Sequence, residues 1–406
     1  MNSQKVLFVS HDANRAGSQL LLLQLIRLLK ERGLATHLLL SGGGELVEDF
    51  KKITSVSILN PGSANGPQSF LQRAVNKLPL WKKIKERSTK TNCIRTKKEL
   101  ENQQFGLVFI NSIANAELYE NVLTFLHHIP LVVFAHELKM SVDIYTTESH
   151  LRFLLRKSSH LITVSNAVSE YYLNHFEYPK SQVSTFTLIN SKEILEKIQV
   201  TDAHLLERNH QIPANSIVIG GCGNAEWRKG NDIFNLIARQ VIEKLPEVPI
   251  YFVWIGAGKN QSFYELIRFD IEQFGLGDRI ILIPPTPNVL DIMTRFDIFL
   301  LSSREDPYPL VVLEAALLEK PIVCFEDAGG APELVEEDAG TVVKYLDVNQ
   351  ATEALSELIL DPVVRHNKGR RAKEKVLERH DTEQSIQKFL SIIESHTQGS
   401  MIEINL

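Results

Sequence analysis

The chain has 406 residues, of which 44% are hydrophobic and 23% charged, so it can bury more than one hydrophobic core and is expected to form two domains. Its formal net charge of -5 argues against a polyanionic partner, and we expect no nucleic acid to bind. The three cysteines lie too far apart for a disulfide framework or a paired-ligand zinc site, and no signal peptide is apparent. These features predict a cytoplasmic protein in a reducing compartment.

The first half of the chain alternates short apolar runs typical of strands with helical segments. Strands are predicted at Lys5–Val9, Thr36–Leu40, Leu107–Ile110, Leu131–Ala135 and Leu161–Val164, with a helix at Gln19–Arg32. This alternation is typical of a parallel sheet that helices cover on both faces.

A second series follows the polar stretch Gln199–Asn215. Strands are predicted at Ser216–Gly220, Ile250–Ile255, Ile280–Ile283, Ile298–Leu301 and Ile322–Cys324, and helices at Asp232–Lys244, Phe263–Phe274, Val289–Thr294 and Leu310–Glu319. We therefore expect an α/β protein with two Rossmann-like, doubly wound parallel-sheet domains facing a central cleft. Ligands of such sheets bind outside the carboxyl ends of the strands.

A glycine-rich, basic loop follows the first strand of the second series. It reads Gly220-Gly221-Cys222-Gly223-Asn224-Ala225-Glu226-Trp227-Arg228-Lys229-Gly230. Glycines let backbone N–H groups approach phosphates, and Arg228 and Lys229 add full charges at a helix N-terminus, so a diphosphate would fit. A dinucleotide fingerprint needs a third glycine three residues after a Gly-x-Gly pair. Glu226 stands there after Gly221-x-Gly223, and Gln261 stands there after Gly256-x-Gly258. The alternative is a tight turn without a ligand.

Two carboxylates flank the start of the helix predicted at Leu310–Glu319. Asp306 lies in a proline-bearing loop, and Glu314 lies within the apolar helix itself. A carboxylate accepts two hydrogen bonds from adjacent hydroxyls, so this pair suits a ribose or a hexose. Alternatively, Asp306 stabilises the helix N-terminus and Glu314 faces solvent, although an unpaired carboxylate in so apolar a helix would be expensive.

At these residues the chain resembles the retaining family 4 glycosyltransferases of the GT-B fold. The family pattern of a Glu, seven residues, and a Glu followed by Ala falls on Asp306 and Glu314. The family phosphate motif, Gly-Arg, four residues and Lys-Gly, falls on Gly223-Asn224 and Lys229-Gly230. The family Gly-Gly-x-Pro-Glu turn falls on Gly329-Gly330-Ala331-Pro332-Glu333. The resemblance covers nearly the whole chain, and its specific motifs lie in the C-terminal half.

The resemblance implies that Lys229 and Arg228 bind the diphosphate and Glu314 the nucleotide ribose. Asn224 stands where the family usually has an Arg, and Arg228 could supply the missing positive charge. Asp306 replaces the usual Glu and is one methylene shorter, so Glu305 could reach the donor sugar instead. The other residues expected at the nucleotide-sugar site are Gly223, Gly329 and Gly330.

In the N-terminal half, the resemblance points to two strand ends. The loop Ser10–Ser18 keeps only Gly17 of the glycine pair that the family places near the diphosphate and the acceptor. His136 and Glu137 follow the strand Leu131–Ala135, where the family has a His-Asp or His-Glu pair whose His reaches the donor sugar. The alternatives are an ordinary turn at the first site and a structural histidine at the second.

Residues 73–100 contain ten Lys or Arg against two acidic residues, with Leu80 and Trp81 among them. Such a segment can bind an anionic membrane surface, which would make the protein peripheral on the inner face of a membrane. The alternative is a solvated excursion between structural elements.

We interpret the chain as an acceptor-side domain at 1–190, a nucleotide-sugar-binding domain at 191–382, and a helix at 383–406 that the family would lay back on the first domain. The expected reaction is transfer of a sugar, with retention, from a nucleoside-diphosphate sugar to a glycan or lipid-linked acceptor, in surface polysaccharide synthesis. The catalytic residues would be His136, Arg228, Lys229 and Asp306. No Asp-x-Asp pair occurs, so neither a metal nor another cofactor is expected. The alternatives are a nucleotide-sugar epimerase and a non-catalytic nucleotide-sugar binder.

Overall fold

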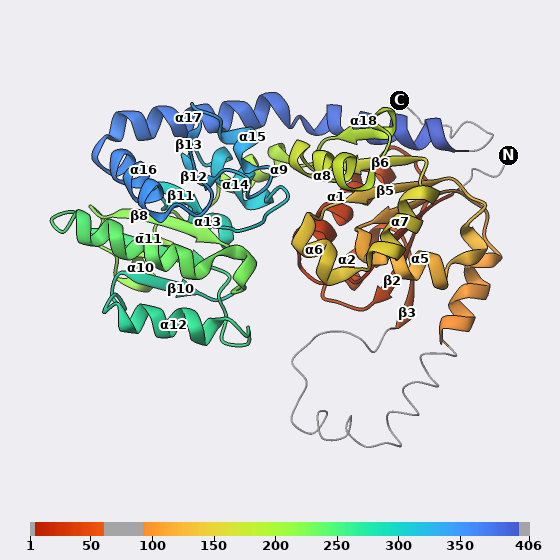
Figure 1. Ribbon diagram of the computed structural model, residues 1–406, viewed down its shortest axis with the longest axis horizontal. Coiled ribbons are helices and arrows are strands. Elements are labelled where there is room, and N and C mark those ends of the chain that lie inside the picture. The colour runs from red at the N-terminus through yellow and green to blue at the C-terminus, as the bar shows by residue number, and fades with distance from the viewer. Residues whose placement is uncertain (1–4, 61–91, 398–406) are drawn as a thin grey trace, which may run out of the picture. The chain divides into compact units, whose positions relative to one another are not determined.

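The computed structural model describes residues 5–60 and 92–397, which form two compact units (Figure 1). The first unit comprises the described residues up to Val164, Val168–Leu188 and the C-terminal segment from Glu383. The second comprises Ser165–Ala167 and Ile189–Thr382. Each unit is built around a parallel sheet, which confirms the predicted fold class of two doubly wound parallel-sheet domains.

The first sheet has seven strands in the order β3-β2-β1-β4-β5-β6-β7, and all neighbouring strands are parallel. The chain order reverses between β1 and β4, which places a topological switch point at their carboxyl ends. The strands are β1 (Lys5–Ser10), β2 (Thr36–Gly42), β3 (Ser55–Asn60), β4 (Phe105–Asn111), β5 (Leu131–Ala135), β6 (His160–Thr163) and β7 (Val183–Thr185).

The helices of the first unit include the last helix of the chain. They include α1 (Gly17–Glu31), α2 (Val47–Ile53), α5 (Ala116–Asn121), α6 (Lys139–Tyr145), α7 (Glu148–Lys157), α8 (Asn166–Phe176) and α18 (Thr382–His396), and residues 92–101 are also helical. The first two residues of α8 and the first of α18 belong to the second unit. Phe389 of α18 is fully buried, and its ring centroid lies 5.5 Å from that of Phe134 and 4.7 Å from that of Phe186. The apolar face of α18 therefore contributes to the core of the first unit.

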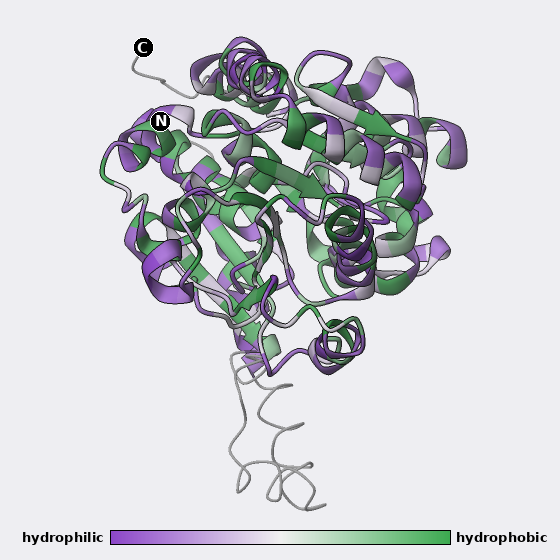
Figure 2. Ribbon diagram, turned by 90° about the vertical axis from the view of Figure 1, so that its left-hand side faces the viewer, coloured by the Kyte–Doolittle hydropathy of each residue, from purple (hydrophilic) through white to green (hydrophobic). Residues whose placement is uncertain are grey.

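The second sheet has six parallel strands in the order β10-β9-β8-β11-β12-β13. Successive side chains of β8 enter different cores, Val218 one and Ile219 the other, because strand side chains alternate between the two faces of a sheet. The strands are largely hydrophobic, and the helices carry both colours of the hydropathy scale (Figure 2). The strands are β8 (Ile217–Cys222), β9 (Ile250–Ile255), β10 (Ile280–Ile283), β11 (Ile298–Leu301), β12 (Ile322–Phe325) and β13 (Gly340–Val343).

The helices of the second unit include several that the sequence did not predict. They are α9 (Ser191–Ile198), α10 (Leu205–His210), α11 (Asn231–Lys244), α12 (Tyr264–Gln273), α13 (Val289–Thr294), α14 (Leu310–Leu317), α15 (Ala331–Val335), α16 (Val348–Leu360) and α17 (Pro362–Arg379). The stretch predicted as a polar separation contains α10, whose Leu206 is buried. The helix predicted at Leu310–Glu319 ends at Leu317, and Glu319 takes a φ of +59°.

The cysteines are free thiols in different environments. Cys222 and Cys324 are buried, and burial raises the pKa of each thiol to about 12, whereas Cys93 is partly exposed. Within residues 5–60 and 92–397, no helix is long and apolar enough to cross a membrane. The same residues contain no group of three or more His, Cys, Asp or Glu side chains that could hold a metal ion.

Candidate active site

The glycine-rich loop of the second unit connects β8 to α11. Gly230 takes a φ of +67°, and a Cβ there would lie 1.9 Å from the Ser302 carbonyl oxygen at the end of β11. A Cβ at Gly223 would lie 3.1 Å from the Lys229 side chain. The two glycines thus let the loop pack against β11 and let the Lys229 stem cross closely over Gly223.

Lys229 and Asp306 form the central pair of the site. The Lys229 ammonium donates to Asp306 Oδ2 at 2.5 Å, and the Ser303 hydroxyl donates to the same oxygen at 3.3 Å. The side chains of Lys229 and Asp306 are 15% and 7% exposed. A charge-assisted hydrogen bond at such low exposure fixes the lysine in one position.

Arg228 lies beside this pair. Its guanidinium donates to the Glu305 carbonyl oxygen at 2.9 Å and to Glu226 Oε1 at 3.2 Å, and it lies 3.9 Å from Asp306 Oδ1. Two cations therefore converge on the Asp306 carboxylate. The carboxylates of Asp306 and Glu226 balance their charges, so an arriving anion would exchange with these carboxylates as the partner of the two cations.

Arg304 anchors the basic loop, a role that the sequence did not reveal. Its guanidinium donates to both carboxylate oxygens of Asp232, at 2.9 and 2.7 Å, and to the Trp227 carbonyl oxygen at 2.7 Å. It also lies 4.3 Å from the centroid of the Trp227 ring. This two-point attachment joins the loop after β11 to the start of α11.

Asn224 and Gln261 connect two loops of the second unit. Gln261 donates to Asn224 Oδ1 at 3.3 Å, and its own oxygen accepts from the backbone N–H groups of Ala225, at 2.7 Å, and Gly258, at 3.2 Å. The residue that replaces the third glycine of a dinucleotide fingerprint is thus a bridge between the loops after β8 and β9. The sequence identified this replacement but not its bridging role.

Glu314 lies on α14 near the end of β8, since both Glu314 and Lys229 act electrostatically on the Cys222 thiol. Burial raises the pKa of the Glu314 carboxyl to about 7. No hydrogen bond to this carboxylate is present among the described residues. Glu314 is partly exposed, so a carboxylate without a protein partner is available to a ligand there.

Gly329 and Gly330 lie against the Asp306 loop. A Cβ at Gly329 would lie 1.9 Å from the Asp306 carbonyl oxygen, and one at Gly330 would lie 2.6 Å from that of Pro307. The Asp306 N–H donates to the Ala328 carbonyl oxygen at 2.6 Å, and the Gly330 N–H donates to that of Pro307 at 3.0 Å. These glycines allow two loops to pack together, and the N–H of Gly330 is already bonded within the protein.

Glu333, the last residue of the same motif, also has protein partners. Its carboxylate accepts from the backbone N–H groups of Asn166, at 3.0 Å, and Ala167, at 2.9 Å. Both residues belong to the short segment Ser165–Ala167 of the second unit. This carboxylate thus has a structural role in the conformation described here.

In the first unit, His136 follows β5 and lies beside the end of β4. Its Nε2 is 2.8 Å from Asn111 Oδ1. Burial, followed by the charge of His11, lowers the pKa of His136 to about 3, so the imidazole is neutral at physiological pH. His136 can therefore act at the site through hydrogen bonds but not through a positive charge.

Glu137 is structural. It is 5% exposed, and its carboxylate accepts from the His136 N–H at 2.8 Å and from the Ser112 hydroxyl. Burial raises the pKa of this carboxyl, although the hydrogen bonds from Ser112 and the backbone oppose the effect. Its contacts fix the turn that presents His136.

The loop after β1 contains polar contacts that the sequence did not predict. Gln19 is 2% exposed and donates to Asp12 Oδ1 at 2.6 Å, and its amide nitrogen lies 2.9 Å from His11 Nε2. Gly17 begins α1, and a Cβ there would meet nothing within 4 Å. Packing within the described residues therefore does not require a glycine at this position.

Residues 203–375 match the sequence model of the family described as Glycosyl transferases group 1. The lipopolysaccharide core biosynthesis mannosyltransferase LpcC of Rhizobium leguminosarum bv. viciae is 28% identical over 151 residues, which are 36% of this chain and 42% of that protein. N-acetyl-alpha-D-glucosaminyl L-malate synthase of Bacillus anthracis is 26% identical over 256 residues, 62% of this chain and 64% of that protein. The chain thus spans less than two thirds of the length of either relative.

Two solved structures share the fold over nearly the whole chain. Anabaena Alr3699/HepE in complex with UDP superimposes with a TM-score of 0.75 at 18% identity, covering 97% of this chain and all of that one. WaaG, a glycosyltransferase involved in lipopolysaccharide biosynthesis, superimposes with a TM-score of 0.66 at 15% identity, covering 97% of this chain and 100% of that one.

The chain therefore has the GT-B fold of known glycosyltransferases. The match of residues 203–375 to the group 1 glycosyltransferases agrees with the family that the motifs of this region indicate.

Proposed function

We propose that the protein transfers a sugar from a nucleoside-diphosphate sugar to a hydroxyl group of a glycan or lipid-linked acceptor, with retention at the anomeric carbon. The observation that carries this proposal is the pair of cations, Lys229 and Arg228, held beside Asp306 at the end of a glycine-rich strand-to-helix connection. Relatives that act in lipopolysaccharide core biosynthesis and a structural neighbour in complex with UDP support it. Surface polysaccharide synthesis is the corresponding process.

We assign the diphosphate to Lys229 and Arg228. Asp306 holds both cations when no ligand is bound, and the arriving phosphates then become their stronger partner. Because the Asp306 carboxylate is bound by Lys229 and Ser303, we assign it to orienting the lysine and leave contact with the donor sugar to Glu305. The unpaired Glu314 carboxylate accepts the ribose hydroxyls.

The remaining site residues complete the proposal. Gly223 and Gly17 offer places where a phosphate can approach the backbone closely. Neutral His136, held by Asn111, hydrogen-bonds the donor sugar. Asn224, Gly329 and Gly330 support the loops around the nucleotide.

The chemistry follows from these assignments. The bond between the anomeric carbon and the β-phosphate oxygen breaks, and the acceptor oxygen bonds to the same face of that carbon. The acceptor proton passes to the departing phosphate. Positive groups preorganised at the leaving diphosphate supply most of the stabilisation, and these groups are Lys229, Arg228 and the N-terminus of α11.

The test is to follow nucleotide release from a panel of nucleoside-diphosphate sugars with and without lipid-linked or soluble glycan acceptors. Release that depends on the acceptor and yields a glycoside of retained configuration supports the proposal. Sugar isomerisation without an acceptor indicates an epimerase instead. Binding without turnover of any sugar in the panel would contradict the proposed activity.

We also propose that the protein is cytoplasmic and peripheral on a membrane, through residues 73–100. Residues 73–91 of this segment lie outside the described residues. Residues 92–101 are helical, and Lys97 lies 5.3 Å from the Phe125 ring centroid. The excess of basic residues in 73–100 is what supports the proposal.

A further inference from the structure

A buried lysine of α17 caps the end of a short helix in the second unit. Lys375 is fully buried, and its ammonium donates to the carbonyl oxygens of Leu334, at 3.2 Å, and Val335, at 3.3 Å. These carbonyls close α15, a five-residue helix. Terminal carbonyls of a helix have no partner within it, so Lys375 satisfies the Leu334 carbonyl and shares that of Val335 with the Ala339 N–H, which lies 3.0 Å away.

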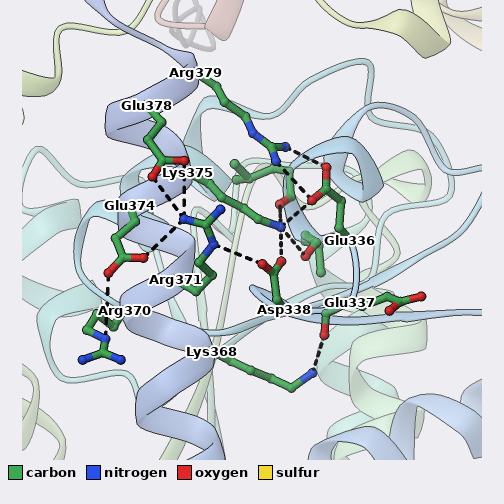
Figure 3. Close-up of polar contacts among 12 residues, drawn as sticks. Glu336, Glu337, Asp338, Lys368, Arg370, Arg371, Glu374, Lys375, Glu378 and Arg379 are labelled. Carbon is green, nitrogen blue, oxygen red and sulfur yellow. Dashed lines mark hydrogen bonds and ion pairs between the residues drawn. The ribbon is translucent and has the colours of Figure 1, made fainter.

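Two carboxylates balance the buried charge. Lys375 pairs with Glu336 at 2.8 Å and with Asp338, and Figure 3 shows its side chain reaching from α17 between these two residues. Arg379 donates to both oxygens of Glu336, at 2.8 and 3.1 Å, and to the Glu333 carbonyl oxygen at 3.0 Å. A buried cation is tolerated only when it is paired and fully hydrogen-bonded, as Lys375 is here.

The same contacts hold a strained residue. Glu336 takes a φ of +47° and a ψ of -137°, a conformation that residues other than glycine rarely adopt. It follows α15 directly, so it sets where that helix ends. The bonds from Lys375 and Arg379 maintain this conformation.

The opposite end of α15 begins at the candidate donor site. Gly330 immediately precedes the helix, and its N–H donates to the Pro307 carbonyl oxygen at 3.0 Å. Gly329 pairs with Asp306, which in turn holds Lys229. Contacts therefore run without a break from Lys375, through α15, to the lysine assigned to the diphosphate.

We propose that Lys375 is a positioning residue of the donor site: by fixing the end of α15, it holds the loop Gly329–Gly330 against Asp306 and thereby keeps Lys229 in place. This inference rests on the proposed function only in calling the site a donor site. Without Lys375, α15 gains freedom at its C-terminal end, and the Gly330 hydrogen bond to Pro307 opens more often.

Three variants of the full chain test the proposal. Lys375→Met keeps the apolar stem and removes the cation. Glu336→Gln, at a half-exposed side chain, weakens the same attachment and serves where the first variant fails to fold. Arg370→Gln is the matched control, because Arg370 lies on the same helix and its ion pair is with Glu374, not with either carboxylate that holds Lys375 (Figure 3).

The first readout is hydrogen exchange of the peptide that contains Gly329–Leu334, which needs no ligand. We expect exchange at least about 10-fold faster in Lys375→Met, and an intermediate increase in Glu336→Gln, with Arg370→Gln unchanged. Unchanged exchange in both test variants, or equal acceleration in all three, would overturn the proposal. The exchange result tests the role of Lys375 even if the wild-type protein binds no nucleotide. Absence of nucleotide binding would refute the proposed function but not the role of Lys375.

The second readout is the dissociation constant for UDP, or for whichever nucleoside diphosphate binds wild type most tightly in a panel. We expect binding to weaken about 3- to 30-fold in Lys375→Met and to be unchanged in Arg370→Gln. A variant that loses thermal stability and Gly329–Leu334 protection but binds the nucleotide as wild type does would show that Lys375 has no influence on the donor site.

Discussion

The Lys229 ammonium lies 2.5 Å from Asp306 Oδ2, although the two residues are 77 positions apart in the chain. One comes from the loop after β8 and the other from the loop after β11, so the sheet brings them together at the switch point where the strand order reverses. A lysine held by a carboxylate is oriented before any ligand arrives. This preorganisation lowers the cost of binding a diphosphate.

We predict that Lys229→Ala lowers turnover about 30- to 1000-fold while the protein stays folded. Losing a charge-assisted hydrogen bond to the leaving diphosphate should cost roughly 2–4 kcal/mol of transition-state stabilisation. Asp306→Asn should reduce turnover less, because the lysine remains but is less well oriented. Steady-state kinetics and circular dichroism check both. A folded Lys229→Ala enzyme with near-normal turnover would remove the phosphate assignment.

A second prediction concerns Glu314 and pH. The unfolded chain loses this proton near pH 4.5 and the folded protein near pH 7, so the raised pKa destabilises the fold as pH rises through this window. Glu314→Gln should therefore raise the free energy of unfolding at pH 8 by at most about 3 kcal/mol, with little effect at pH 4.5. Melting temperatures at the two pH values measure this difference.

The same substitution should weaken nucleotide binding at pH 8, because an amide accepts hydroxyl hydrogen bonds less strongly than a carboxylate does. Wild-type affinity should fall as pH drops below 7, and the variant should lack this dependence. Neutral His136 should contribute no step near that pH. Calorimetric titrations at several pH values measure both effects, and tight, pH-dependent binding by Glu314→Gln would refute the ribose assignment.

The third prediction is that Arg228 supplies the charge that Asn224 lacks. Arg228→Ala should lower turnover, and adding Asn224→Arg to it should restore part of the loss, since both positions would serve the same phosphate. Asn224→Arg also removes the hydrogen bond from Gln261, so Asn224→Ala is the control for that bond. Additive effects in the double-mutant cycle would argue against compensation.

The fourth prediction is that residues 73–100 bind anionic membranes reversibly. Each basic residue near an anionic surface contributes up to about 1 kcal/mol, and the interaction weakens with salt. Cosedimentation with anionic vesicles should exceed that with neutral ones at low salt, and it should fall when Lys82, Lys83 and Lys85 are changed to Glu. Equal pelleting with both vesicle types would assign the segment to a solvated surface.

The strands that form the two sheets were predictable where apolar runs were long. The bounds of β5, β9, β10 and β11 match the predictions because each is a continuous apolar run covered on both faces. The edge strand β7 was missed, since it has three partly exposed residues, Val183–Thr185, and gives no periodic signal. The helix α10 was missed because its only buried residue is Leu206.

At the candidate site, the glycines, lysine and carboxylates of local motifs could be found in the sequence. Their partners could not. Arg304 and Asp232 are 72 residues apart, and nothing in either local sequence indicates a bidentate pair. Lys375 is likewise indistinguishable in the sequence from the exposed basic residues around it on α17, and only the packing of that helix makes it the buried one.

The two buried thiols can report on opening of the second unit, because they are protonated at neutral pH. With pKa values near 12, Cys222 and Cys324 hold almost no thiolate at neutral pH, so a thiol reagent modifies them only when the second unit opens. Partly exposed Cys93 should react first and can be replaced by Ser to leave a silent background. The rate at which Cys222 and Cys324 are labelled then measures how often the second unit opens. Because Cys222 directly precedes Gly223, its protection by successive nucleotides would rank candidate donors by how firmly each closes the site.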